Sequence, residues 1–81
     1  MTDYLIVIDT TGLRCPLPVL KVRKSLPILK KKDVALIIAD DPLAEIDLRH
    51  FCSIKGYEIK SISPNQSDKK QYYEIMSLNY K

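Results

Sequence analysis

Four short runs rich in apolar and aromatic residues constrain the fold of this chain most. They predict strands at residues 4–8, 34–39, 57–63 and 72–80. A helix is expected between the first and second strands and another between the second and third, which gives the order βαβαββ. With only 81 residues, this order fits a single domain spanning residues 1–81. The fold class that follows is α/β, a two-layer sandwich with both helices on one face of a four-stranded sheet.

The first helix is expected to begin near Cys15. Pro16 and Pro18 suit its first turn, where N–H groups lack intrahelical partners. Pro27 removes a hydrogen bond further along, so the helix should kink or end there. The apolar residues at helical spacing are Val19, Val22, Leu26 and Leu29, and the basic residues on the other side are Lys21, Arg23 and Lys24.

The second helix has its own start and stop signals. Asp41 is expected as the N-cap, Pro42 at the first helical position and Gly56 at the C-terminal stop. Asp40 and Asp41 are therefore interpreted as a strand terminus and a cap, with an acid–base role as the alternative. The expected inner stripe consists of Ala44, Leu48, Phe51 and Cys52.

The composition is that of a globular protein, with 46% hydrophobic and 28% charged residues. Residues 1–4 carry no basic leader, and no stretch approaches the roughly 20 apolar residues that span a bilayer. We therefore expect a soluble, cytoplasmic protein with no membrane partner. Two cysteines do not make a disulfide framework, and free thiols are the default in a reducing compartment.

The net charge of +3 conceals an asymmetry. Residues 10–32 contain seven basic side chains and no acidic one, whereas the remainder has six basic and ten acidic side chains, a net charge of −4. A cationic field of this kind can hold an anionic ligand, an acidic partner surface or a phosphate backbone. It can equally be a solvated helix face.

Cys15 is the candidate site residue, within the segment Gly12-Leu13-Arg14-Cys15-Pro16-Leu17-Pro18. A helix N-terminus, the adjacent Arg14 and the basic helix that follows all favour a thiolate, which is the reactive form of cysteine. Pro16 and Pro18 would hold the sulfur at a rigid helix start. The alternative is that Cys15 is merely a small cap residue, although cysteine is a poor cap.

Several kinds of active site are missing from the sequence. His50 is the only histidine and is interpreted as a surface residue, so no Cys-His-Asn arrangement is indicated. Two cysteines and one histidine, widely spaced, do not predict a metal site, and there is no glycine-rich phosphate loop. We expect neither metal nor cofactor. A nucleophile without an acid or base suits a carrier that accepts a group from one protein and presents it to another.

At these residues the sequence resembles the TusA/SirA-like family of small sulfur carriers, and most closely its TusA branch. The family pattern is an acidic residue, then Gly-Leu-x-Cys-Pro-x-Pro, a helix, and a strand ending in Asp-Asp-Pro. Here it reads Asp9, residues 12–18 and residues 37–42. The segment Val22-Arg23-Lys24 and the pair Phe51-Cys52 carry the closeness to TusA. The resemblance covers nearly the whole chain and implies a mixed four-stranded sheet.

The resemblance also implies a function. Such proteins take sulfur from a cysteine desulfurase as a persulfide on the motif cysteine, here Cys15, and pass it to a downstream acceptor protein. In the best-known branch the relay ends in 2-thiolation of the tRNA wobble uridine. The implied protein is a sulfurtransferase acting as a covalent carrier rather than a turnover enzyme. It would be a monomer that needs no direct contact with nucleic acid. Arg14 is then a candidate to stabilise the thiolate or persulfide.

Two alternatives of different classes stay open. An RNA-binding module would use the basic first helix, together with Lys69, Lys70 and the C-terminal tyrosines as stacking groups. A regulatory adaptor would bind a protein without covalent chemistry. For Cys52 the choice is between a buried apolar residue and a resolving thiol that approaches Cys15. The tyrosines in question are Tyr57, Tyr72, Tyr73 and Tyr80, which otherwise fill the sheet.

Overall fold

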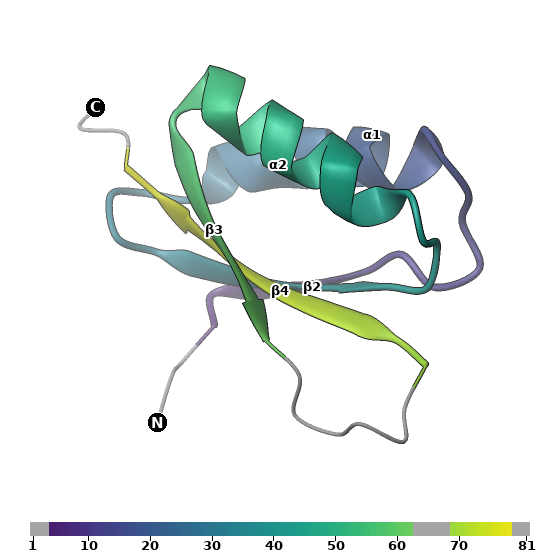
Figure 1. Cartoon of the computed structure of the whole chain (residues 1–81). Coiled ribbons are helices and arrows are strands. Elements are labelled where there is room, and N and C mark those ends of the chain that lie inside the picture. Colours follow the sequence, from purple (N-terminus) through teal and green to yellow (C-terminus); the bar gives the residue numbers. More distant parts are fainter. Residues whose placement is uncertain (1–3, 63–68, 79–81) are drawn as a thin grey trace.

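A computed structural model describes residues 4–62 and 69–78 of the chain, and both helices lie on one face of a single sheet (Figure 1). The predicted two-layer α/β sandwich with the order βαβαββ is confirmed. Residues 63–68 and 79–81, which include the expected turn and Tyr80, lie outside the described residues. The elements are β1 (Ile6–Asp9), α1 (Leu17–Ser25), the 3-10 turn η1 (Leu26–Ile28), β2 (Val34–Ala39), α2 (Ala44–Lys55), β3 (Tyr57–Ile62) and β4 (Gln71–Ser77).

The four strands lie in the order β1-β2-β4-β3, which sequence reasoning had left open. β1 and β2 are parallel, and β4 is antiparallel to both β2 and β3, so the sheet is mixed. Because β1 and β2 are parallel neighbours, the loops that follow them leave the same edge of the sheet. These two loops build the candidate site.

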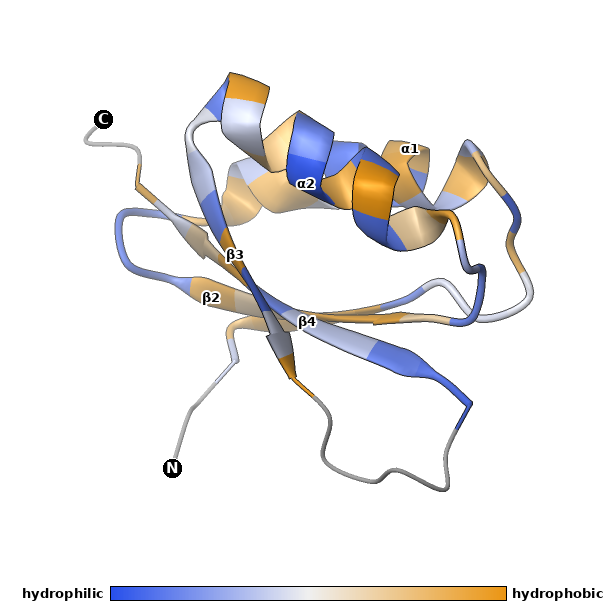
Figure 2. Cartoon of the chain, in the orientation of Figure 1, coloured by the Kyte–Doolittle hydropathy of each residue, from blue (hydrophilic) through white to orange (hydrophobic). Residues whose placement is uncertain are grey.

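The core fills the space between the helices and the inner face of the sheet. On β2 the buried Ala35, Ile37 and Ala39 alternate with half-buried residues, so the helices cover only one of its faces. Val22 and Leu26 pack down from the α1–η1 segment, while Leu48, Cys52 and Ala44 pack from α2. Figure 2 shows orange, hydrophobic residues along β2 and both orange and blue residues on the two helices above it.

Two tyrosines of the described strands contribute to the packing between the sheet and the helices. Tyr73 on β4 is fully buried, and its hydroxyl donates to Gln71 Oε1 at 2.8 Å. Tyr57 on β3 is half-buried and stacks on Phe51, with ring centroids 5.8 Å apart. Both observations favour the interpretation that strand tyrosines fill the sheet rather than stack on RNA bases.

Helix α1 begins at Leu17, two residues later than expected. Pro16 occupies the N-cap position, and Cys15 therefore lies in the loop rather than in the helix. The expected end at Pro27 is confirmed, because α1 stops at Ser25 and the chain continues as the tighter turn η1. Proline lacks the N–H that an α-helix would need at that position.

Helix α2 also begins later than its sequence signals predict. Leu43 is the N-cap and Ala44 the first helical residue, so Asp41 and Pro42 precede the helix. Asp41 still binds the segment before the helix, since its Oδ1 accepts the Leu43 N–H at 3.1 Å. The predicted stop is confirmed: Gly56 is left-handed, with φ 79°, and donates its N–H to the Cys52 carbonyl.

Candidate functional site

The loop that carries Cys15 is fastened to the end of β2 by two neighbouring carboxylates. Asp40 accepts the Gly12 N–H at 3.0 Å, and buried Asp41 accepts the Cys15 N–H through Oδ2 at 2.5 Å. Hydrogen bonds from the Leu43 and Cys15 N–H groups, with the nearby charge of Arg14, hold the pKa of Asp41 below its usual value. The two aspartates therefore anchor the loop that carries Cys15. From the sequence alone they were interpreted as a strand terminus and a helix cap.

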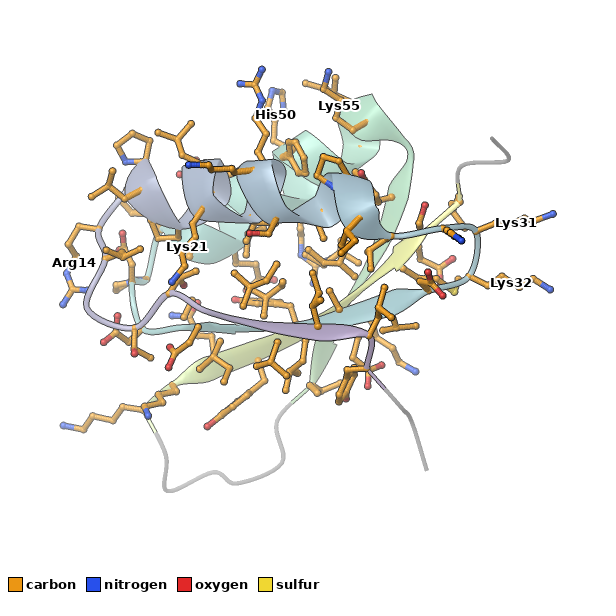
Figure 3. All side chains as sticks on the ribbon, turned by 180° about the vertical axis from the view of Figure 1, so that it is seen from behind. Arg14, Lys21, Lys31, Lys32, His50 and Lys55 are labelled. Carbon is orange, nitrogen blue, oxygen red and sulfur yellow. The ribbon has the colours of Figure 1, made fainter. Side chains whose placement is uncertain are left out.

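The Arg14 side chain forms an ion pair with Asp40. Its guanidinium Nη1 lies 3.0 Å from Asp40 Oδ1 and also donates to the Leu13 carbonyl. Figure 3 shows Arg14 at the outer end of the loop that leads into α1. Arg14 thus fixes the loop in this structure, and its expected role in stabilising the Cys15 thiolate or persulfide stays a prediction.

Cys15 is exposed, and its sulfur meets a carboxylate instead of a cation. Sγ donates to Oδ2 of Asp47, a half-buried residue of α2, at 2.8 Å. The hydrogen bond to Asp47, desolvation, and the charges of Asp47 and Asp41 all raise the pKa of Cys15. The expectation of a lowered pKa is therefore wrong for the free protein, because the helix starts after the sulfur and the nearest charges are negative.

Asp47 is the site residue that sequence reasoning missed. It looks like an ordinary acidic residue in the first part of a helix, where the helix dipole favours negative charge. The missing signal is the pairing of β1 with β2, which brings the loop after β1 beside the start of α2. Given that pairing, a carboxylate one turn into α2 becomes a candidate neighbour of Cys15.

The two prolines of the motif have different surroundings. Pro18 is the second residue of α1 and is buried, whereas Pro16 is exposed and lines a groove beside the sulfur. The peptide bond between Cys15 and Pro16 is cis. Pro16 lines the groove together with Cys15, and the expectation that both prolines shape the site stays a prediction.

A groove of about 620 Å³ opens beside Cys15 between α1 and α2. Its apolar walls include two strongly exposed isoleucines, Ile46 at 68% and Ile54 at 64% of full exposure. His50 and Lys55 project from α2 on the side away from the sheet (Figure 3) and line the groove. The groove is lined by Cys15, Pro16, Val19, Arg23, Ile46, Asp47, His50, Phe51, Ile54 and Lys55.

Cys52 lies on the opposite side of α2 from this groove. It is 1% exposed within the core, and burial raises the pKa of its thiol to about 11. Cys52 is therefore a buried apolar residue in this structure, and it forms no disulfide with Cys15. A resolving role would require it to leave the core.

The basic residues of the N-terminal third do not form one patch. Lys21 turns towards β1 and donates to the Asp9 carbonyl at 2.6 Å. Lys31 and Lys32 occupy the turn before β2, at the opposite end of the molecule from Arg14 (Figure 3). Two of the seven residues of the predicted cationic field, Lys31 and Lys32, therefore lie far from Arg14, whereas Arg23 lines the groove beside Cys15.

Residues 4–62 and 69–78 contain neither a candidate metal centre nor a helix that could span a membrane. In these segments no group of three or more His, Cys, Asp or Glu side chains is placed to hold a metal ion. None of the helices there combines the length and the apolar character required to cross a membrane.

Comparisons with known proteins agree with this architecture. The SirA-like protein of Desulfitobacterium hafniense, known from a crystal structure, superposes with a TM-score of 0.77 at 21% sequence identity. The match covers 93% of this chain and 100% of that one, and at this identity it establishes the fold. The family model for the sulfurtransferase TusA matches residues 6–76. The chain therefore belongs to the TusA sulfurtransferase family.

Proposed function

We propose that this protein carries persulfide sulfur on Cys15, taking it from a cysteine desulfurase and passing it to a downstream acceptor. The observation that carries the proposal is the exposed Cys15 sulfur at the mouth of an apolar groove, in a chain of a sulfurtransferase family. An exposed sulfur can meet a partner's sulfur directly. A groove with apolar walls can receive the partner segment that delivers it.

The sulfur transfer is an exchange between a thiol and a persulfide, and it needs no external oxidant. The Cys15 sulfur attacks the outer sulfur of the donor persulfide, so that a new S–S bond forms as the donor S–S bond breaks. The donor sulfur leaves with the electron pair as a thiolate and takes up the proton that Cys15 loses. Handing the outer sulfur to an acceptor cysteine repeats the same thiol exchange in the opposite role.

The end of the relay is proposed from the family resemblance. The acceptor would pass sulfur on towards 2-thiolation of tRNA, in the cytoplasm, while the carrier itself acts as a monomer without touching the RNA. The dispersion of the basic residues supports this over a direct RNA-binding role, because phosphate binding usually needs a continuous basic surface. A non-covalent adaptor would use the same groove but would be indifferent to the loss of the sulfur.

The test is the mass of the intact protein after incubation with a cysteine desulfurase, pyridoxal phosphate and cysteine. We expect wild type to gain one sulfur atom that a reductant removes. Cys15→Ser should gain none, because the attacking sulfur is gone. Cys52→Ser, which removes a buried sulfur, is the matched control and should load like wild type. Loading of Cys15→Ser, or equal loss in both variants, would contradict the assignment of Cys15.

A further inference from the structure

The contact between Cys15 and Asp47 connects two separate elements at the reacting atom. Asp47 is presented by α2, and its Oδ2 lies 2.8 Å from Sγ of Cys15 in the loop before α1. A carboxylate accepts hydrogen bonds and does not donate them, so this bond forms only while the sulfur keeps its proton. The bond also fixes the direction of the sulfur, towards the groove that Cys15 and Asp47 line together.

The other charged groups around the sulfur do not cancel this effect. Asp41 adds a second negative charge and accepts the Cys15 N–H, while Arg14 is paired with Asp40. The groove itself brings cationic or titratable groups from both helices, namely Arg23, His50 and Lys55. The charges that act on the thiol most strongly are those of Asp47 and Asp41, and both disfavour the thiolate.

We propose that Asp47 is a positioning residue that keeps unloaded Cys15 in its thiol form and turns its sulfur towards the groove. This rests on the proposed function only in taking Cys15 as the sulfur carrier. Because the thiolate is the nucleophile, the free carrier reacts slowly with small electrophiles and oxidants that meet it in solution. A docked donor holds its persulfide against the sulfur, and this proximity offsets the small thiolate fraction. Asp47 thus makes Cys15 selective for sulfur that arrives on a protein.

The experiment measures alkylation of Cys15 by iodoacetamide between about pH 6 and pH 10. The reaction is followed on the tryptic peptide of residues 15–21, which contains Cys15 and excludes Cys52. In Asp47→Asn we expect the rate near pH 7 to rise roughly threefold or more, and the rate–pH curve to move to lower pH, because one negative charge leaves the sulfur. Asp47→Glu, which keeps the charge, should stay close to wild type.

Glu45→Gln is the matched control. It removes one carboxylate from the same part of α2, but Glu45 is paired with Arg49 at 2.8 Å rather than with the sulfur. Its alkylation curve should coincide with that of wild type. An unchanged curve in Asp47→Asn, or an equal shift in Glu45→Gln, would overturn the role of Asp47. Unfolding curves of the variants show whether each one is folded.

One comparison needs no variant. Wild-type Cys15 should react more slowly than glutathione with iodoacetamide at neutral pH, and an equal or faster reaction would also overturn the proposal. Alkylation requires no desulfurase, so the two proposals fail separately. If the alkylation rates of the variants are as expected, but neither wild type nor any variant gains sulfur from a desulfurase, the carrier function is contradicted and the role of Asp47 stands. If sulfur loads but Asp47→Asn alkylates like wild type, only the role of Asp47 falls.

Discussion

At the scale of single residues, Asp41 couples the geometry of the site to the stability of the fold. Its carboxylate accepts N–H groups from Cys15 and from Leu43, so it joins the loop before α1 to the segment before α2. Hydrogen bonds to the charged form favour that form, which is why the pKa of Asp41 lies below its ordinary value. Protonation would weaken both attachments at once.

This predicts an acid-dependent contribution of Asp41 to stability. A carboxyl whose pKa is lower in the folded state stabilises the fold above its unfolded pKa of about 3.9, and this stabilisation is lost as the pH falls through the folded pKa. Asp41→Asn should therefore melt at a lower temperature than wild type near pH 7, and the difference should shrink below about pH 4. Melting curves across this range check it, with exposed Glu58→Gln as the control. A difference that is constant with pH would contradict the argument.

The chemistry of the site was the least predictable feature at this scale. The candidate residue Cys15 follows from its sequence context, but the protonation state of its sulfur depends on which charges fold against it. Arg14 is adjacent in sequence yet binds Asp40, and Asp47 is 32 positions away yet binds the sulfur. Local sequence predicts a lowered pKa for Cys15, and the tertiary contacts reverse it.

At the scale of secondary-structure elements, the turn between η1 and β2 contains a conformational misfit. Lys32 has φ 70°, in the left-handed region that costs a side-chain-bearing residue on the order of 1–2 kcal/mol. The turn is otherwise well bonded, since the Lys32 N–H reaches the Ser77 carbonyl at 2.9 Å and Asp33 accepts the Lys30 N–H. The backbone bonds therefore hold Lys32 in a shape that glycine would adopt without strain.

Lys32→Gly should accordingly stabilise the protein, by up to about 1 kcal/mol once the greater flexibility of glycine in the unfolded chain is subtracted. The measurement is the free energy of unfolding from urea titration. Lys31→Gly is the control, because Lys31 is the neighbouring residue and has no positive φ. It should be destabilising or neutral. A change in stability of the same sign and size in both variants would contradict the strain assigned to Lys32.

The elements themselves were largely predictable, and their ends and partners were not. Residues 34–39 were predicted as a strand and form β2 without change, because a continuous apolar run bounded by charged residues has clear limits. The start of α1 was misplaced because prolines fit a first turn as well as the loop before it. The strand order depends on contacts between distant segments, such as β4 pairing between β2 and β3, which periodicity does not encode.

At the scale of the whole molecule, the groove beside Cys15 and the lysines of the turn before β2 lie apart. The groove with Cys15 and Arg23 lies between the helices, whereas Lys31 and Lys32 lie at the end away from Arg14 (Figure 3). In the proposed function a sulfur donor docks over the groove, and it need not reach that far turn. Charges near the groove should therefore affect loading more than charges in the turn.

Charge reversal tests this division. Arg23→Glu should slow sulfur loading from a desulfurase by roughly tenfold at low salt, because a charge at the docking surface changes the rate of encounter and the fit of the complex. Lys31→Glu makes the same change of charge at the far turn and should load within about twofold of wild type. The rate of mass gain under limiting desulfurase measures both. Equal slowing would show that net charge, rather than the groove, governs the encounter.

The central claim is that Cys15 holds one transferable sulfur atom, and cyanide tests it most directly. Cyanide removes the outer sulfur of a persulfide as thiocyanate and leaves the thiol. Protein loaded by a desulfurase and then separated from it should release about one thiocyanate per chain and return to its original mass. Cys15→Ser should release none. Release of thiocyanate from Cys15→Ser, or none from wild type that had been incubated with an active desulfurase, would contradict the account.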